Sequence, residues 1–274
     1  MIGRANTGGS WLEYERHGER GPRVLLVMGM GASRLGWRGQ VEDLGGDHQL
    51  LTFDNPGIGG SGPIRGSLSI RGMAEDTLRL LDHVGWERTH IVGISLGGMI
   101  AQELALAARD RVESLSLLTT HAGSRALGLP LPPADGLSLF VRQRVATMRG
   151  DRERHKRLLL ELLFPAEVLD GPVGRRAADH IGTVFAGRDN VGTLQAQTWA
   201  AMRHDTKRRL RSLEGLRTLV VRSGRDRLIS PAAQADLHRR IPGAELLNLP
   251  DAGHGALSQC REVINTRLRD WFAT

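Results

Sequence analysis

The sequence predicts an α/β domain with a mostly parallel central sheet, helices on its flanks and a helical segment inserted into the chain. Short apolar runs of strand length alternate with longer segments whose apolar residues recur at helical spacing, which is the pattern of β-α-β units. The alternation stops after residue 123 and resumes near residue 212. We therefore expect a core domain of residues 1–123 and 212–274, with a helical insertion over residues 124–211.

The first half of the chain supplies the clearest β-α-β spacing. Segment 11–15 is a candidate antiparallel edge strand, and buried strands are expected at residues 23–28, 49–53, 90–94 and 113–119. Helices are expected at residues 69–84 and 96–109, where apolar side chains follow the helical period.

The second half begins with the irregular segment and then returns to the parallel pattern. A proline-rich loop is expected at residues 129–133, followed by helical patterns at residues 136–149, 153–163, 174–186 and 191–204. A strand at 216–221, a helix at 231–241 with proline in its first turn, a strand at 244–249 and a final helix at 257–272 complete the core.

Length and composition exclude several classes of protein. A chain of 274 residues that is 40% hydrophobic and 24% charged can bury one large core, which excludes disorder and a disulfide-stapled miniature. The single cysteine, Cys260, can form no internal disulfide and has no partner for a metal cluster. The chain has no apolar run long enough for a signal peptide or a membrane span. We therefore expect a soluble cytoplasmic protein with no membrane partner.

The positive charge is concentrated in the insertion. The formal net charge is +7, and residues 124–211 hold sixteen Lys and Arg against nine Asp and Glu, so the rest of the chain is neutral overall. No nucleic-acid motif or aromatic stacking platform accompanies this charge, so we expect no nucleic-acid partner. Two interpretations stay open: the basic segment steers anionic substrates, or it is simply a solvated surface.

A candidate nucleophile lies in the segment Gly93-Ile94-Ser95-Leu96-Gly97, which matches G-x-S-x-G. The motif lies between a buried strand and an amphipathic helix, where a sharp turn would raise the Ser95 hydroxyl above the sheet edge. The glycines at 93 and 97 would allow the close backbone approach that such a turn needs. Because a serine hydroxyl is a poor nucleophile without a base, this prediction also requires a histidine and a group that orients it.

The base and the orienting acid are expected in the last two loops of the core. His254 follows the last strand and has glycine on both sides, and Asp226 follows the strand before it. Asp226 would hold the imidazole tautomer and stabilise the imidazolium. Asp251 is the rival acid, but it lies in the histidine's own loop, where a turn-forming role is the expected one. Acyl transfer also needs oxyanion donors, and the backbone N–H groups of Leu96 and Met30 are the candidates.

Together these segments resemble the α/β-hydrolase superfamily, and the resemblance covers almost the whole chain. It is carried by GISLG at 93–97, MGMGAS at 28–33, DNPGIGGS at 54–61, GRDRLIS at 224–230 and DAGHG at 251–255. The resemblance implies a Ser95, His254 and Asp226 triad with no cofactor and no metal. Met28-Gly29 stands where the superfamily usually has His-Gly, a variant that resembles small esterases such as the anthracycline methylesterases.

The resemblance also places residues 124–211 where the superfamily has its lid. Gly29 and His121 are candidates to contact substrate, and a structural role for His121 is an equal alternative. The candidate wall residues of the substrate pocket are Leu129, Leu131, Phe140, Met148, Phe164, Phe185 and Trp199. We take Asp54 as a turn or capping residue.

The leading functional hypothesis is a serine hydrolase that cleaves a carboxylic ester of a small molecule through an acyl-enzyme. Lactone hydrolysis of the enol-lactonase type, C–C bond hydrolysis and cofactor-free perhydrolysis use the same triad and stay open. The alternative from another class is a ligand-binding module on a hydrolase scaffold. The acyl and alcohol specificity and the oligomeric state are not predicted.

Overall fold

An eight-stranded sheet forms the centre of the computed structural model, which describes residues 1–123, 133–185 and 191–273. In these residues the strand order is β1-β2-β4-β3-β5-β6-β7-β8. β1 and β2 pair antiparallel, as do β2 and β4, and every other neighbouring pair is parallel. The strands are β1 (Ile2–Asn6), β2 (Trp11–His17), β3 (Arg23–Val27), β4 (Gln49–Phe53), β5 (Thr89–Ile94), β6 (Val112–Leu118), β7 (Thr218–Ser223) and β8 (Glu245–Leu249). The predicted fold class is confirmed.

Two apolar layers cover the sheet because successive strand side chains point to opposite faces. In β3, Leu25 and Val27 pack into the layer with helices α2 (Ile70–His83), α3 (Leu96–Ala107) and α9 (Pro231–Arg240). Val24 and Leu26 pack into the opposite layer with α1 (Arg38–Leu44) and α11 (Arg261–Phe272). The central strands β3 to β7 are therefore buried on both sides, which explains why they read as nearly continuous apolar runs rather than alternating ones.

The helices of the core begin where the sequence signals predict. Ser69 precedes α2, and its hydroxyl accepts a hydrogen bond from the Gly72 N–H at 3.0 Å. Ser230 caps α9 in the same way, and Pro231 occupies the first turn, where no intrahelical hydrogen bond is lost. These local contacts fix the directions in which the helices leave the loops that follow the strands.

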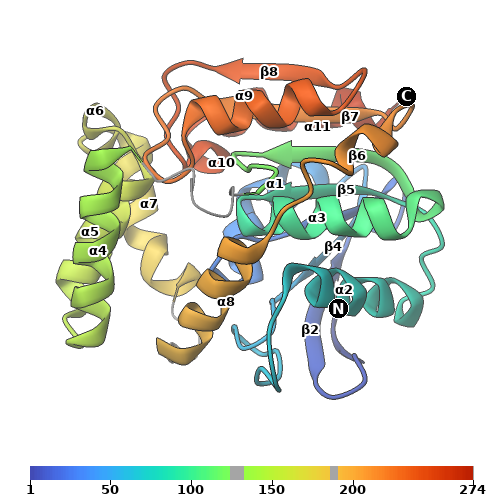
Figure 1. Ribbon diagram of the computed structural model, residues 1–274, viewed down its shortest axis with the longest axis horizontal. Coiled ribbons are helices and arrows are strands. Elements are labelled where there is room, and N and C mark those ends of the chain that lie inside the picture. Colours follow the sequence, from blue (N-terminus) through green and yellow to red (C-terminus); the bar gives the residue numbers. More distant parts are fainter. Residues whose placement is uncertain (124–132, 186–190, 274) are drawn as a thin grey trace.

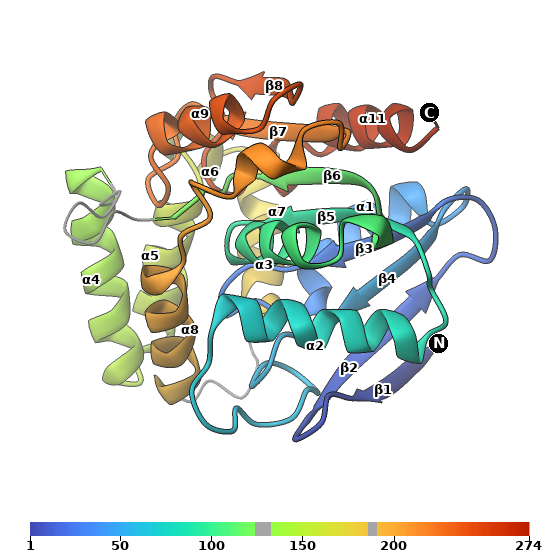
Figure 2. The ribbon, with the colours of Figure 1, turned by 45° about the vertical axis from the view of Figure 1, so that its right-hand side comes forward.

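Residues between β6 and β7 form a group of helices beyond the carboxyl ends of the strands (Figure 1). They are α4 (Ala134–Met148), α5 (Arg152–Leu163), α6 (Ala166–Leu169), α7 (Pro172–Val184) and α8 (Val191–Arg203). The chain leaves the core and returns to it at adjacent points: Gly123 and Asp205 form a bridge, and the Thr206 N–H donates to the Ala122 carbonyl at 2.8 Å. Figure 2 shows α4, α5 and α8 standing across the end of the sheet.

Several boundaries differ from the sequence expectations. The edge of the sheet is β1, not segment 11–15, which lies second from the edge. β1 was missed because it is five residues long and buries only Ala5. The expected final helix is divided at Cys260 into α10 (Ala256–Gln259) and α11. The short helices α1 and α6 were not predicted, and the loop expected at 129–133 lies almost entirely outside the described residues.

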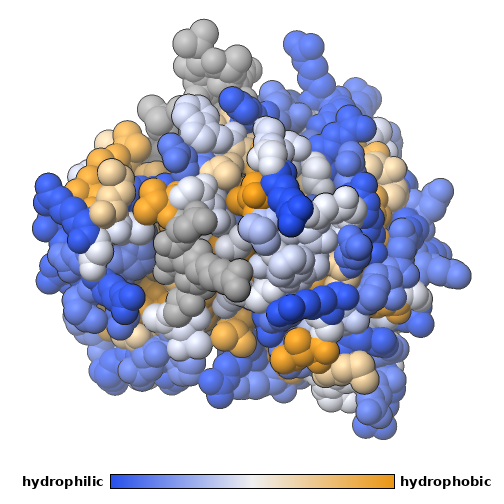
Figure 3. Space-filling model, turned by 90° about the horizontal axis from the view of Figure 1, so that it is seen from below, coloured by the Kyte–Doolittle hydropathy of each residue, from blue (hydrophilic) through white to orange (hydrophobic). Residues whose placement is uncertain are grey.

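The surface of the described residues is mixed. On the face shown in Figure 3, hydrophilic side chains predominate and apolar ones form separate patches. In the described part of the chain, no helix combines the length and the apolar character that a membrane crossing requires.

Candidate active site

Ser95 occupies the turn between β5 and α3 in a strained conformation. Its φ is 54° and its ψ is −120°, a region that residues other than glycine rarely adopt. Such a conformation costs on the order of 1–3 kcal/mol and persists only where surrounding contacts enforce it. Here the Ser95 N–H donates to the Leu118 carbonyl at 3.0 Å, and the Thr120 hydroxyl donates to the Ser95 carbonyl at 2.7 Å. The turn is therefore held from the neighbouring strand β6.

The two glycines of the motif are required by close packing. A Cβ on Gly97 would overlap the carbonyl of Val27, and one on Gly93 would overlap the carbonyl of Gly97. α3 can therefore approach β3 and β5 closely only because these positions carry no side chain. The close approach that the sequence predicts at these positions is present in the structure.

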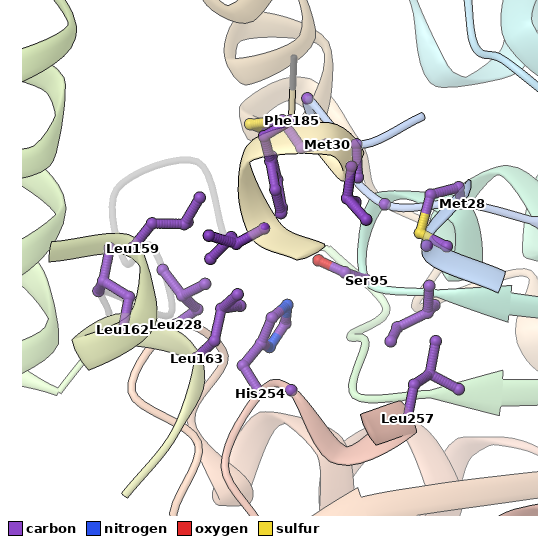
Figure 4. Close-up of a pocket in the computed structure, with 18 of the residues that line it drawn as sticks. Met28, Met30, Ser95, Leu159, Leu162, Leu163, Phe185, Leu228, His254 and Leu257 are labelled. Atoms are coloured by element: carbon purple, nitrogen blue, oxygen red, sulfur yellow. The ribbon is translucent and has the colours of Figure 1, made fainter. Parts of the chain in front are cut away.

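His254 lies in the loop between β8 and α10 and is bonded to a carboxylate. Its Nδ1 lies 2.8 Å from Oδ2 of Asp226, and both side chains are buried. Because a carboxylate only accepts hydrogen bonds, Nδ1 of the neutral ring carries the hydrogen and Nε2 remains an acceptor. Figure 4 shows the Ser95 oxygen and the His254 ring pointing into the same cavity.

The glycines beside His254 serve a purpose that the sequence did not reveal. A Cβ on Gly255 would lie 2.6 Å from the Phe164 ring, and a Cβ on Gly253 would lie 2.5 Å from the Leu163 carbonyl. The Gly255 N–H also donates to the Leu163 carbonyl at 2.8 Å. These glycines therefore let the end of α5 dock on the histidine loop.

Asp226 follows β7 and accepts four hydrogen bonds. Oδ1 accepts from the N–H groups of Leu228 and Ile229, both at 2.8 Å. Oδ2 accepts from His254 and, at 2.9 Å, from the Nε2 amide of Gln234. Gln234 is fully buried on α9 and also donates to the Ile229 carbonyl and accepts from the Ser223 N–H. Sequence reasoning missed Gln234, since a lone helical glutamine carries no motif.

The other candidate carboxylates lie elsewhere. Asp251 is exposed, and its carbonyl accepts from Gln259. Asp54 is fully buried but accepts from the N–H groups of Arg34 and Gly60 and pairs with the Arg34 guanidinium, so it holds its own loop together. Both residues match the turn roles that the sequence indicates.

A cavity of about 890 Å³ separates the sheet edge from the inserted helices. Ser95 and His254 line it, as do Met30 and Leu96, whose N–H groups are the candidate oxyanion donors. Within the described residues, neither N–H donates to another protein group. Gly29 also lines the cavity, and a Cβ there would lie 3.4 Å from the Ser95 Cβ. A side chain at position 29 would therefore contact Ser95 inside the cavity.

His121 and Phe140 both line this cavity, as the sequence suggests. Burial lowers the pKa of His121 to about 4, and its Nδ1 accepts a hydrogen bond from the Gly123 N–H at 2.9 Å. The ring is therefore neutral at pH 7. His121 therefore lines the cavity and also holds the start of the insertion, whereas its contact with substrate stays a prediction.

Trp199 does not line the cavity, which corrects the sequence interpretation. Its side chain is 50% exposed, and the Arg203 guanidinium lies 5.8 Å from its ring centre. The cavity face of α8 is carried by Leu194, Thr198 and Ala201, so a residue one position after Thr198 is rotated away from it. Of the other expected wall residues, Phe164 and Phe185 line the cavity, Met148 is exposed, and Leu129 and Leu131 lie outside the described residues.

Comparisons with known proteins agree with this architecture. A family model described as alpha/beta hydrolase fold matches residues 22–259. A protein of Azorhizobium caulinodans named "Putative carbamate hydrolase RutD" is 31% identical over 269 residues, which are 96% of each chain.

Solved structures of hydrolases superpose over nearly the whole chain. A thermophilic esterase from Thermogutta terrifontis has a TM-score of 0.81 at 25% identity and covers 99% of this chain and 97% of its own. An enol-lactonase from Burkholderia xenovorans LB400 has a TM-score of 0.84 at 23% identity and covers 99% and 100%, respectively. At 23% identity, the likeness to the enol-lactonase shows the fold alone.

Proposed function

Because this chain belongs to the α/β-hydrolase fold family, we propose that it hydrolyses carboxylic esters with Ser95 as nucleophile, His254 as general base and Asp226 as the orienting acid. One observation carries the proposal. The hydroxyl of a conformationally strained serine shares a cavity with a histidine whose far nitrogen is bonded to a buried carboxylate. This arrangement leaves Nε2 of His254 available to remove the serine proton.

The proposed reaction proceeds in two steps. Nε2 of His254 takes the hydroxyl proton while Oγ of Ser95 bonds to the carbonyl carbon, and the tetrahedral intermediate then expels the alcohol with that proton. Water next attacks the acyl-enzyme, giving one proton to His254, and collapse returns that proton to Ser95 and releases the acid. Both intermediates carry an oxyanion, which the N–H groups of Leu96 and Met30 would stabilise. Each such donor is worth about a hundredfold to a thousandfold in rate.

We propose that the inserted segment 124–211 acts as a cap over this site. The support is its placement beyond the carboxyl ends of the strands and the docking of α5 on the histidine loop. Gly29, His121 and Phe140 are the proposed contacts to substrate, since all three line the cavity.

Carbamate hydrolysis is a second candidate, because the relative at 31% identity carries that activity in its name. It requires the same attack by Ser95 on a carbonyl carbon and differs in the leaving group and in the group that remains on the enzyme. The lactone and C–C bond reactions predicted as alternatives rest on the shared triad.

Labelling with a fluorophosphonate tests the nucleophile, and a substrate screen tests the reaction. We expect covalent labelling of the wild type that is lost in Ser95→Ala, and hydrolysis of short esters that is lost in the same variant. Lactones and carbamates belong in the screen as rivals. A folded wild type that is neither labelled nor active on any of them would overturn the proposal in favour of a ligand-binding role.

A further inference from the structure

The charged side chains that line the cavity are unbalanced. The described lining residues include four arginines but only one carboxylate, that of Glu42. The arginines are Arg38, Arg144, Arg176 and Arg261. Arg38 pairs with Glu42 at 2.7 Å and Arg261 pairs with it at 3.1 Å. Arg176 is exposed, so water solvates its charge. Arg144 is therefore the lining cation that is neither paired nor fully solvated.

Arg144 lies on α4 and is partly buried. No carboxylate of the described residues lies within ion-pair distance of its guanidinium, and the guanidinium has no hydrogen bond to another described residue. Burial lowers its pKa, yet a guanidinium keeps its proton in proteins. Comparable partly buried arginines are compensated: Arg34 pairs with Glu13 at 3.3 Å, and Arg227 pairs with Asp135 at 3.2 Å. Arg144 thus pays a desolvation cost that no described group offsets.

The described groups around Arg144 add no second charge beside its guanidinium. His155 faces it from α5, and both burial and the charge of Arg144 lower the pKa of His155, so that ring is neutral at pH 7. Its Nδ1 lies 2.7 Å from the Thr147 hydroxyl and 3.0 Å from the Gln143 amide, which fix the ring. The adjoining wall is apolar and includes Phe140. An anion brought here would find a cation in a poorly hydrated setting, where ion pairs are strong.

Apolar side chains of α5 line the cavity that Ser95 and Arg144 share. Figure 4 shows Leu159, Leu162 and Leu163 of α5 on the cap side of His254, and α4 packs against α5. A ligand that reaches both Ser95 and Arg144 must therefore have an apolar stretch between its reacting carbonyl and its charged end.

We propose that Arg144 is a specificity-determining residue that binds a carboxylate at the distal end of the substrate, so that the preferred esters or lactones are monoanions with an apolar spacer. This inference rests on the proposed hydrolase function and names its substrate class. It also replaces the hypothesis that the whole basic segment steers anionic substrates with a specific role for one side chain, Arg144.

A pair of esters with equal chain length tests the inference. The probes are p-nitrophenyl hexanoate and the mono-p-nitrophenyl ester of adipic acid, in which a carboxylate replaces the terminal methyl group. Arg144→Gln should lower kcat/KM for the adipate ester about tenfold to a hundredfold, the range for a lost charge-assisted hydrogen bond. It should change kcat/KM for the hexanoate ester by less than about threefold, because a neutral acyl chain makes no ionic contact.

Arg142→Gln is the matched control. Arg142 lies on the same helix and is exposed outside the cavity lining, so its loss changes the net charge equally without touching a ligand. Arg144→Lys keeps the charge and should restore part of the preference. Equal effects of Arg144→Gln and Arg142→Gln on the ratio of the two esters, or no effect of either, would overturn the inference.

A binding measurement separates this inference from the proposed function. Calorimetric titration of adipate into Ser95→Ala protein needs no catalysis, and adding Arg144→Gln should weaken the Kd at least about tenfold while adding Arg142→Gln should not. If the esters are not hydrolysed but this difference appears, ester hydrolysis is wrong and the anion site stands. If the esters are hydrolysed but the variants bind adipate equally, the hydrolase stands and the anion site is wrong.

Discussion

Replacing Gln234 by leucine should separate support of the triad from support of the fold. Gln234 is fully buried and makes three hydrogen bonds besides its packing: to Asp226 Oδ2 at 2.9 Å, to the Ile229 carbonyl at 2.8 Å and from the Ser223 N–H at 2.9 Å. Leucine fills much of the same volume but can form none of them. The substitution therefore leaves a buried donor and a buried acceptor unpaired and removes one of the four donors to Asp226.

The size of both effects follows from these contacts. At about 1 kcal/mol for each neutral hydrogen bond, with extra cost for the groups left unpaired, the free energy of unfolding should fall by about 3 kcal/mol. A hydrogen bond to a charged group is worth about 1.5–3 kcal/mol. Asp226 keeps three donors, so we expect a partial loss of His254 alignment and a fall in reaction rate of about tenfold rather than inactivation.

Gln102→Leu is the matched control for stability. Gln102 is also fully buried and also makes three hydrogen bonds, to the Gly98 and His121 carbonyls and from the Thr206 hydroxyl, but it does not touch Asp226 or His254. Urea unfolding followed by tryptophan fluorescence should show similar losses for both variants. The rate of fluorophosphonate labelling, measured well below the unfolding transition, should fall about tenfold only in Gln234→Leu. Equal labelling rates in the two variants would refute a positioning role for Gln234.

Three further outcomes follow from the structure. Asp226→Asn should reduce kcat by about a thousandfold or more because His254 loses its carboxylate partner, whereas Asp251→Asn, at an exposed position, should leave kcat within about twofold; a larger effect at Asp251 would reverse the assignment of the acid. Gly97→Ala should destabilise the fold by about 3 kcal/mol or more in urea unfolding because its Cβ overlaps backbone, while Gly9→Ala, which has open space, should change little. Burial lowers the pKa of His204 from 6.5 to about 3, so the unfolded state binds a proton at a higher pH than the folded state does. As the pH falls from 6.5 to 4, the free energy of unfolding should therefore fall by up to about 1.4 kcal/mol per pH unit. Urea titrations at each pH should show a weaker dependence of this free energy on pH in His204→Gln.

The prediction from sequence was most accurate where a local pattern and a packing requirement coincide. The G-x-S-x-G segment needs glycine at 93 and 97 because backbone passes at those points, so the motif and its placement between a strand and a helix were readable together. His254 and Asp226 were located because each lies in a loop that directly follows a predicted strand.

The prediction failed where the outcome depends on which face an element presents. Trp199 lies on an amphipathic helix, and the sequence does not state which side of α8 faces the cavity. The edge strand β1 buries one residue, so it has almost no periodic signal. Gln234 and Arg144 carry no motif, and their surroundings are formed by residues distant in the chain.

Local sequence patterns were sufficient to predict the α/β-hydrolase fold, the position of the helical insertion and the residues proposed for the chemistry. These depend on strand and helix periodicity and on glycines that a local turn or close packing requires. The contacts of the folded chain were needed to show which acid contacts His254, which residues of the insertion line the cavity, and that Arg144 is a partly buried arginine of the basic segment without a carboxylate partner among the described residues. Burial, ion pairing and desolvation depend on contacts between elements that are distant in the chain. The net charge of +7 therefore does not identify Arg144, whose guanidinium is placed beside an apolar cavity only by folding.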